Sequence, residues 1–148
     1  MTKILFVCHG NICRSPMAEF IFREMIRQRG IESEYYIESA AVSTEEIGNP
    51  LYPPARRCLT RHGIPFNLTR TARQVTPEDY GRFDRIICMD HSNLRWLSWI
   101  IPQDPENKIC LMMSFTGQSR DVADPWYTGD FDLTFDDISA ACTAMLQQ

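Results

Sequence analysis

The chain has 148 residues, of which 44% are hydrophobic, so it is long enough to bury a core and short enough to form a single domain over residues 1–148. Its formal net charge of −4, with no basic stripe between aromatic residues, argues against nonspecific nucleic-acid binding. No apolar run approaches the ~20 residues that span a bilayer, and the first apolar run is too short for a secretory signal, so we expect a cytoplasmic protein with no membrane segment.

Short apolar runs alternate with amphipathic segments along the chain. Four of these runs are predicted strands, at residues 4–7, 35–39, 85–89 and 108–112. The alternation predicts an α/β fold, with a parallel sheet covered by helices on both faces. In such folds the ligand site lies beyond the carboxyl ends of the strands.

Amphipathic periodicity predicts a helix over residues 17–29 that ends at Gly30, with Ser15 as its N-cap and Pro16 as its first residue. Further helices are expected at residues 54–62, from Thr76 onward, at 93–101 and at about 134–146. The last helix is expected to pack one apolar face on the sheet, formed by Phe135, Ile138, Ala141 and Met145.

The six cysteines are predicted to be thiols rather than three disulfides. Four of them lie in predicted helices or apolar strands, where cysteine packs as a small hydrophobic residue: Cys58, Cys88, Cys110 and Cys142. No Cys-x-x-Cys pair or His/Cys cluster has the spacing of a zinc site. The sequence therefore predicts no metal site.

Residues 8–16, CHGNICRSP, connect the first predicted strand to the first predicted helix. The backbone N–H groups of such a loop converge on one point, beside the positive end of the helix dipole. Gly10 and Asn11 tolerate positive φ angles, and Arg14 offers a planar fork for two phosphate oxygens. The same field stabilises Cys8 as a thiolate. The loop is therefore predicted to bind an oxyanion and to supply a nucleophile.

A thiolate that attacks a phosphate monoester expels an alkoxide or phenoxide, which needs a proton donor. Asp124 is the candidate acid, in a turn-forming segment, DPWY, between the last strand and the last helix. Trp126 and Tyr127 follow it, and two large aromatic residues there are either core anchors or the walls of a slot for a flat substrate group. An oxyanion loop in the same chain favours the slot.

These segments together resemble the low-molecular-weight protein tyrosine phosphatases. The family signature V-C-x-G-N-[IS]-C-R-S-P-x-A-E stands here at residues 7–19, and its D-P-[WY]-Y segment at residues 124–127. Further similarity at residues 61–64, 72–74 and 88–94 extends the resemblance over nearly the whole chain. It implies a four-stranded parallel sheet in the order 2-1-3-4, and hydrolysis of phosphotyrosine and aryl phosphate monoesters through a phosphocysteine, without metal or cofactor.

The resemblance also implies roles for individual residues. Cys8 attacks phosphorus, Ser15 hydrogen-bonds its sulfur, and Asp124 protonates the leaving group and then takes a proton from water. The phosphate oxygens are held by Arg14 and the loop residues His9, Gly10, Asn11, Ile12 and Cys13. Cys13 resembles the second loop cysteine, which traps Cys8 as a reversible disulfide; a small loop filler is the alternative.

Three positions depart from the family pattern. Glu45 stands where an aromatic pocket wall is frequent; with Glu46 it either favours basic over acidic phosphopeptides or is a solvated pair. His9 stands where leucine is frequent, at the pocket mouth, where it would make binding depend on pH. Arg70 replaces a histidine, so the hydrogen bonds that support the loop are expected to differ.

The expected partner is a phosphotyrosine-containing protein, with phosphate or another oxyanion in the loop. The protein is expected to be a monomer or a weak homodimer, the latter through Trp126 and Tyr127. An arsenate reductase of the same fold needs two more cysteines on a mobile segment, whereas Cys88 and Cys110 lie in predicted strands. A protein arginine phosphatase tends to carry threonine where Ile12 stands. A noncatalytic phosphate-binding module has no need of Cys8, Arg14 and Asp124 together.

Overall fold

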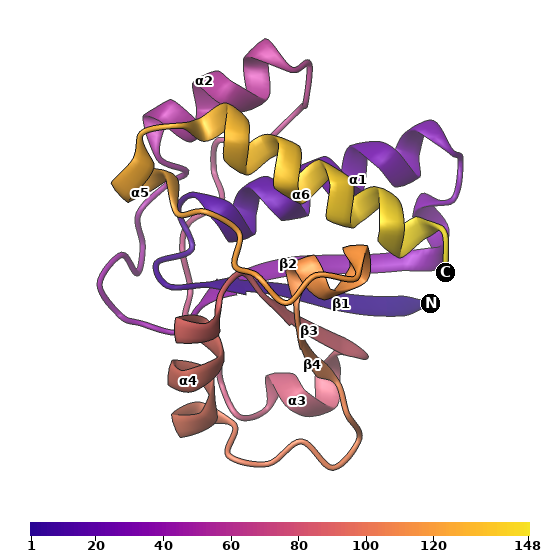
Figure 1. The fold of residues 1–148 in the computed structure, drawn as a ribbon, viewed down its shortest axis with the longest axis vertical. Helices are drawn as coiled ribbons and strands as arrows, with labels where there is room; N and C mark the ends of the chain where they lie inside the picture. The colour runs from indigo at the N-terminus through magenta and orange to yellow at the C-terminus, as the bar shows by residue number, and fades with distance from the viewer.

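The computed structural model describes residues 1–148. A parallel sheet runs through the middle of the molecule (Figure 1), with its four strands in the order β2-β1-β3-β4. The strands are β1 (Thr2–Cys8), β2 (Tyr35–Ala41), β3 (Arg85–Cys88) and β4 (Ile109–Leu111). Between β1 and β2, Thr2 lies opposite Tyr35 and Cys8 opposite Ala41. The predicted fold class and strand order are confirmed.

Helices cover both faces of this sheet. On one face lie α1 (Arg14–Gln28) and α6 (Phe131–Leu146), with α2 (Pro53–Arg61) packed beside α6; on the other lie α3 (Asp79–Arg82) and α4 (His91–Ile100) (Figure 1). The remaining short helices are η1 (Glu32–Glu34), η2 (Met112–Thr116) and α5 (Pro125–Thr128). No helix is both long enough and apolar enough to cross a membrane.

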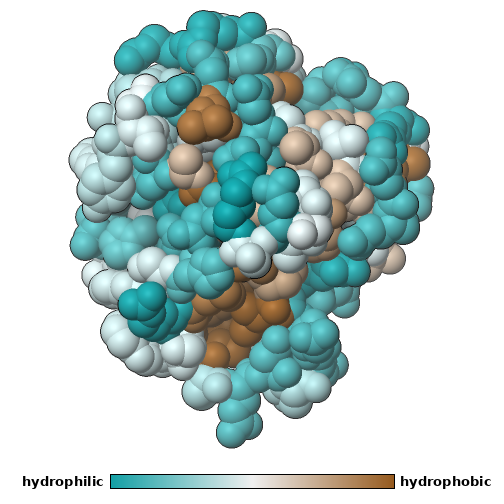
Figure 2. Space-filling view, viewed as in Figure 1, coloured by the Kyte–Doolittle hydropathy of each residue, from teal (hydrophilic) through white to brown (hydrophobic).

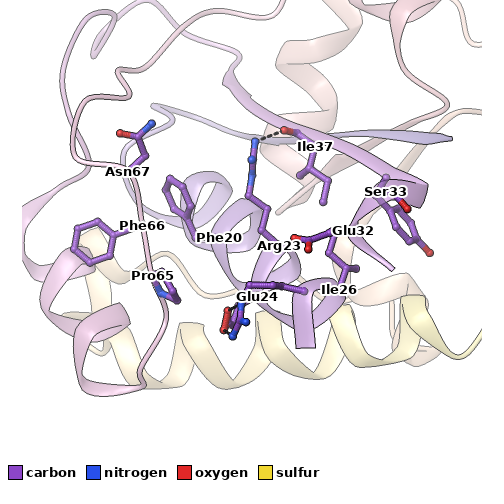
Figure 3. Close-up of a pocket in the computed structure, with 12 residues that line it drawn as sticks. Phe20, Arg23, Glu24, Ile26, Glu32, Ser33, Ile37, Pro65, Phe66 and Asn67 are labelled. Atoms are coloured by element: carbon purple, nitrogen blue, oxygen red, sulfur yellow. Dashed lines mark hydrogen bonds and ion pairs between the residues drawn. The ribbon is translucent and has the colours of Figure 1, made fainter. Parts of the chain in front are cut away.

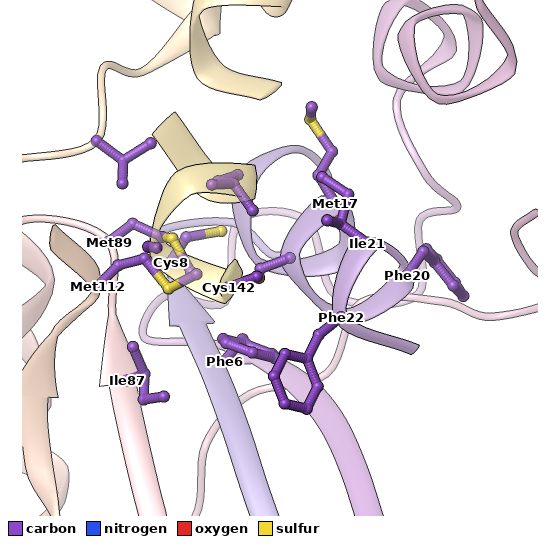
Figure 4. Close-up of a cluster of buried hydrophobic side chains, with 14 of the residues drawn as sticks. Phe6, Cys8, Met17, Phe20, Ile21, Phe22, Ile87, Met89, Met112 and Cys142 are labelled. Atoms are coloured by element: carbon purple, nitrogen blue, oxygen red, sulfur yellow. The ribbon is translucent and has the colours of Figure 1, made fainter. Parts of the chain in front are cut away.

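Each face of the sheet has its own core, because alternate residues of a strand point to opposite faces. Ile4, Phe6 and Cys8 of β1 belong to the larger cluster, under α1 and α6, whereas Leu5 and Val7 belong to a smaller one, under α4. Figure 4 shows Cys8 within the larger cluster, beside methionines of the neighbouring segments. The end of β1 is therefore held by packed side chains. Between α4 and α3 a hydrophobic patch reaches the surface (Figure 2).

Helix α1 begins at Arg14, earlier than expected, and its N-cap is Cys13 without any side-chain cap hydrogen bond. The prediction that Ser15 caps this helix and that Pro16 is its first residue is therefore wrong. The chain turns from the loop into the helix directly at Arg14, so Ser15 lies inside the first turn. Its hydroxyl is then free for a contact with the loop, which is described below.

The other helices differ from the prediction mainly at their starts. α4 begins at His91 because Asp90 accepts from the Asn93 N–H at 2.7 Å in a capping box, and α6 begins at Phe131 because Asp130 accepts from the Leu133 N–H at 2.9 Å. The helix expected from Thr76 is only the short α3. The DPWY segment, expected as a turn, forms α5.

The predicted apolar face of α6 packs on the larger cluster. Ile138, Ala141 and Met145 are buried as expected. Phe135 is only half-buried and stacks on His62, with 3.8 Å between ring centroids. Phe135 also packs against the larger cluster, and α2, which lies beside that end of the helix, offers it a flat partner.

Candidate active site

A cavity of about 240 Å³ lies where β1 ends and α1 begins. Figure 1 shows this end of the sheet on the side away from both chain termini. The cavity is lined by Cys8, His9, Gly10, Asn11, Ile12, Cys13, Arg14, Glu45, Glu46, Asp124, Trp126 and Tyr127. Every predicted site residue but Ser15 thus borders one space, although the loop and the DPWY segment are more than a hundred residues apart in sequence.

Ser15 lies behind the cavity, against the sulfur of Cys8. Its Oγ is 3.0 Å from Cys8 Sγ, and the backbone N–H groups of Asn11 and Ser15 donate to the same sulfur at 3.3 and 3.4 Å. Asn11 Nδ2 donates to Ser15 Oγ at 2.8 Å, so the hydroxyl proton of Ser15 remains for the sulfur. Three donors therefore converge on Cys8 Sγ, and each of them stabilises a negatively charged sulfur.

Asn11 locks the shape of the loop. Its φ of 61° lies in the left-handed region, which costs energy for a residue other than glycine. Its side chain offsets this cost, because Nδ2 also donates to Ser39 Oγ at 3.0 Å and Arg70 donates to Oδ1 at 2.6 Å and to the backbone carbonyl at 3.0 Å. The Ser39 hydroxyl in turn donates a hydrogen bond to the Glu19 carboxylate at 2.6 Å. Arg70, which departs from the family pattern, is thus a direct support of the loop.

Gly10 serves the loop through its size rather than through its φ angle. It is not among the glycines with positive φ, so it does not use the left-handed conformation that glycine tolerates. A Cβ at this position would lie 3.2 Å from Glu46 Cγ, closer than most such contacts. The absence of a side chain lets the loop and the Glu46 segment approach one another.

The loop presents backbone donors with no partner in the protein. The N–H groups of Gly10, Ile12 and Cys13 make no hydrogen bond, and the first residue of a helix, here Arg14, has no partner for its N–H within the helix. Buried N–H groups are almost always paired, and Ile12 and Cys13 are buried. Unpaired donors around a thiol form a binding site for an oxyanion.

Arg14 closes the ring of donors. Its guanidinium is buried; Nη1 donates to Asp90 Oδ2 at 2.8 Å and to the Val122 carbonyl at 2.9 Å, and Nη2 donates to Asp124 at 3.3 Å. Nε and the second proton of Nη2 make no hydrogen bond, and these two donors form the fork that fits two phosphate oxygens. Burial alone lowers the pKa of Arg14, but the negative groups around it, first Cys8 and then Asp124, outweigh burial and raise this pKa above its usual value.

Asp124 lies at the mouth of the cavity, with 28% of its side chain exposed, whereas Cys8 at the base is 3% exposed. One carboxylate oxygen caps α5 by accepting from the Trp126 N–H at 3.0 Å, and the other faces Arg14. The Trp126 ring packs against Tyr52, with 5.0 Å between ring centroids, and the Tyr127 side chain is exposed to solvent. The carboxylate and the two aromatic residues thus share the rim, and α5 fixes their relative positions.

The opposite rim carries charged groups. Glu45 Oε2 is hydrogen-bonded to His9 Nε2 at 3.0 Å, and the Glu45 side chain is 66% exposed. Glu46 accepts from the Asn49 side chain at 2.6 Å. Glu45 and His9 therefore form one exposed pair at the pocket mouth, rather than two independent side chains.

The thiols other than Cys8 are suited to remain protonated. All six cysteines are free. Burial raises the pKa of the Cys13 thiol, and the charges of Cys8 and Asp124 raise it further; burial likewise raises the pKa of Cys88, Cys110 and Cys142. Cys13 lies in the loop but in an environment that disfavours its thiolate.

A larger hollow of about 570 Å³ lies elsewhere, between α1, β2 and residues 65–67 (Figure 3). Its polar groups bond to one another: Arg23 donates to the Ile37 carbonyl at 2.6 Å and Arg27 to Glu24 at 2.6 Å. It contains none of the predicted site residues. We therefore assign the active site to the smaller cavity.

The fold also brings Cys58, His62 and Asp132 together, with one potential ligand atom from each lying within 4.8 Å of the others. The sequence did not indicate this cluster, because Asp132 is distant in the chain. Its groups already satisfy one another, since Asp132 pairs with His62 at 2.9 Å and with Arg61 at 3.1 Å. A guanidinium beside the carboxylate opposes a bound cation.

Sequence reasoning missed Asp90, which both positions Arg14 and caps α4. It also missed the Val122 carbonyl, which accepts from Arg14. A signal for Asp90 was present, because an acidic residue two positions after a strand of a parallel sheet lies at the ligand-binding edge. A backbone carbonyl leaves no such signal.

Comparison with known proteins agrees with this geometry. The family model described as low molecular weight phosphotyrosine protein phosphatase matches residues 3–148. The low molecular weight phosphotyrosine protein phosphatase of Gallus gallus is 42% identical over 99% of this chain and 94% of its own. The crystal structure of YfkJ from Bacillus subtilis superposes with a TM-score of 0.93 at 38% identity, over 99% and 93% of the chains. The structure titled drosophila arginine phosphatase superposes with a TM-score of 0.86 at 30% identity, over 99% of this chain and 96% of that chain.

Proposed function

The chain belongs to the low molecular weight phosphotyrosine protein phosphatases, which are cysteine-dependent protein tyrosine phosphatases, and on that premise we propose that it hydrolyses phosphotyrosine and aryl phosphate monoesters through a phosphocysteine. The observation that carries this proposal is the set of three donors on Cys8 Sγ inside a loop of unpaired amides. That arrangement stabilises both a thiolate and a phosphoryl group in contact with it.

In the first step Cys8 Sγ attacks phosphorus from the base of the cavity. The sulfur–phosphorus bond forms as the bond from phosphorus to the ester oxygen breaks. The equatorial oxygens carry the charge of the transition state, and the unpaired loop amides of Gly10, Ile12, Cys13 and Arg14, with the fork of Arg14, are placed to hold them. The leaving oxygen then points to the mouth, where Asp124 lies.

Asp124 is the proposed general acid and base. Arg14, its present partner, has free donors for the phosphate. Asp124 gives its proton to the leaving phenol oxygen. In the second step it takes a proton from the water that attacks phosphorus, and the Cys8 thiolate departs, stabilised by Ser15.

Phosphotyrosine is proposed as the substrate group because apolar and aromatic side chains face one another across part of the cavity. Ile12 lines the cavity beside the loop, and Trp126 and Tyr127 form the opposite wall. An aryl ring buries apolar surface there, whereas the cationic guanidinium of phosphoarginine is better served by a polar residue at the position of Ile12. The similarity to a structure titled drosophila arginine phosphatase makes phosphoarginine the substrate to test against it.

We further propose that residues 1–148 act as one catalytic domain, without metal or cofactor, as a monomer or weak homodimer. The exposed Trp126 and Tyr127 supply apolar surface for self-association. The cytoplasm is the proposed compartment because six free thiols suit a reducing environment.

The test compares the wild type with Cys8→Ser and Asp124→Asn in the presence of a chelator. We expect turnover of p-nitrophenyl phosphate and phosphotyrosine peptides to vanish with Cys8→Ser. Asp124→Asn is expected to lower kcat by about 10²- to 10⁴-fold, and more for phenyl phosphate than for p-nitrophenyl phosphate, because a poorer leaving group depends more on the acid. Loss that is equal for all leaving groups would contradict the role of Asp124.

Phosphoarginine peptides and arsenate with a thiol reductant are assayed in parallel. A higher kcat/KM for phosphoarginine, or thiol-dependent arsenate reduction, would replace the proposed substrate while retaining the loop chemistry. Binding of phosphate without any turnover would identify a noncatalytic module and overturn the proposal.

A further inference from the structure

Helix α4 exposes two tryptophans close to the active-site cavity. Trp96 and Trp99 are 36% and 71% exposed, and they are three residues apart, so they share one face of the helix. Neither lines the cavity, and the mechanism proposed above uses neither. Large aromatic residues exposed side by side are typical of recognition surfaces.

The two tryptophans are continuous with the mouth of the cavity. The ring of His9, which lines the cavity, contacts Trp96 edge-on at 5.2 Å between centroids, and Trp96 contacts Trp99 at 5.4 Å. We call His9, Trp96 and Trp99 the aromatic strip. It leads from the loop that holds the phosphate out to the surface of α4.

Acidic groups lie at the cavity end of this strip. Glu45 contacts His9 at 3.0 Å through one oxygen, its other oxygen makes no hydrogen bond, and its side chain is 66% exposed. Glu46 is its neighbour on the same rim. A carboxylate next to exposed indole rings is the combination that attracts a cationic side chain, through charge and through the negative faces of the rings.

We propose that the aromatic strip, with Glu45, binds an arginine or lysine side chain of the substrate protein close to the phosphotyrosine. This inference rests on the proposed phosphotyrosine phosphatase activity and names the substrate class that the site selects. An extended chain advances about 3.3–3.6 Å per residue, so the bound side chain belongs to a residue within about three positions of the phosphotyrosine. Arginine fits better than lysine, because a planar guanidinium stacks on indole rings.

Arg95 is the one group on α4 that opposes this assignment. It precedes Trp99 by four residues and is exposed, so it shares a face of the helix with that tryptophan. It makes no cation–π contact with either indole, so neither ring has a cationic partner within the protein. Its positive charge favours an acidic side chain instead. Substitution of Arg95 therefore tests whether the side chain that binds on α4 is positively or negatively charged.

The experiment measures kcat/KM for phosphotyrosine peptides that have alanine at all neighbouring positions but one. That position carries arginine, glutamate or leucine, and it is moved from three residues before the phosphotyrosine to three after it. For the wild type we expect arginine to be preferred over alanine at one or two positions, by between about 2-fold and about 30-fold. Trp99→Ala is expected to remove this preference, whereas Trp99→Phe and Arg95→Gln keep it.

The control variant is Tyr36→Ala, which removes an exposed aromatic residue at the amino end of β2, away from the cavity. It is expected to keep the arginine preference. Turnover of p-nitrophenyl phosphate, which is too small to reach Trp99, reports separately on the catalytic loop. If the wild type did not turn over p-nitrophenyl phosphate, the proposed phosphatase function would be wrong, and the result would not bear on the aromatic strip.

Three results would overturn the inference. The first is a wild type that does not distinguish arginine from alanine at any position. The second is a preference for glutamate that disappears with Arg95→Gln, which would mean that α4 recognises an acidic side chain. The third is a preference for leucine that disappears with Trp99→Ala, which would mean that the strip is only an apolar contact.

Discussion

Ser15 Oγ and Cys8 Sγ lie 3.0 Å apart, and this contact is the last link of a longer chain of hydrogen bonds. Arg70 donates to Asn11, Asn11 donates to Ser15, and Ser15 has its proton left for the sulfur. Arg70 and Ser15, which do not line the cavity, therefore help to determine how many donors the sulfur receives. Such buried networks bond strongly only when every member is satisfied.

Ser15→Ala is expected to slow catalysis without unfolding the loop. It removes one of three donors to the sulfur and leaves the Asn11 and Ser15 backbone N–H groups in place. By analogy with the loss of one donor to a developing charge, kcat should fall by about 10²-fold, with breakdown of the phosphocysteine slowed most. Rapid-quench kinetics with p-nitrophenyl phosphate should then show a burst of p-nitrophenol. Ser114→Ala, which removes a hydroxyl bonded to the Leu111 carbonyl, is the control and should show no change.

Arg70→Ala is expected to loosen the loop through Asn11. It removes the bonds of 2.6 and 3.0 Å that hold the Asn11 side chain and carbonyl in the left-handed conformation. Because the loop amides then lose their alignment, inorganic phosphate should bind about tenfold more weakly, and kcat/KM should fall by a similar factor. Competitive inhibition by phosphate measures this effect. Arg27→Ala, which breaks an ion pair on the surface of α1, should leave the inhibition constant unchanged; a merely structural role of Arg70 would lower stability and not this constant.

The fold was predictable because its signals are local and periodic. Four apolar runs separated by amphipathic segments indicated a parallel sheet, and residues 8–16 indicated an oxyanion loop, since both are contiguous in sequence. The start of α1 was predicted wrongly because Ser-Pro is a strong cap signal, whereas here the loop geometry overrides it and Ser15 serves the sulfur. Where a functional site determines the backbone conformation, as it does at the start of α1, local capping propensity does not decide where the helix begins.

The parts of the site that were missed are those that depend on tertiary contacts. Asp90 and the Val122 carbonyl reach Arg14 from segments more than 70 residues away, and only the assembled sheet brings them there. The pairing of His9 with Glu45, and the contact of His9 with Trp96, likewise join three separate segments. Composition and spacing carry no information on which exposed side chains meet.

Asp79→Asn is expected to destabilise the fold in a manner that depends on pH. Asp79 is fully buried; burial raises its pKa, but hydrogen bonds from Arg73 at 3.0 Å and from the Thr76 N–H at 2.8 Å outweigh burial and hold the pKa below its usual value. A carboxyl group with a lowered folded-state pKa stabilises the fold above its unfolded pKa of about 3.9, and this contribution is lost as the pH falls through the folded value.

At pH 7 the substitution should therefore cost about 1–3 kcal/mol of unfolding free energy, a range reduced because Arg82 and part of Arg73 are solvent-exposed. Below pH 4 the difference from the wild type should shrink. Urea unfolding at pH 7, 5 and 3 measures it. Asp136→Asn, at an exposed position of α6, is the matched control. A cost that does not change with pH would mean that Asp79 acts through packing rather than through its charge.

Alkylation should separate the two cysteines of the loop. Iodoacetamide reacts with the thiolate form of cysteine. Three donors converge on Cys8 Sγ, whereas burial and the neighbouring negative groups raise the pKa of Cys13. At pH 7 we expect complete modification of Cys8 while Cys13 remains a thiol, as measured by peptide mass spectrometry.

Inorganic phosphate should protect Cys8, and Cys8→Ser should remove the fast phase. Cys88 and Cys142, which are buried in the core, should react only when the protein unfolds. Equal rates at Cys8 and Cys13 would contradict the donor arrangement, because three hydrogen-bond donors converge on the sulfur of Cys8.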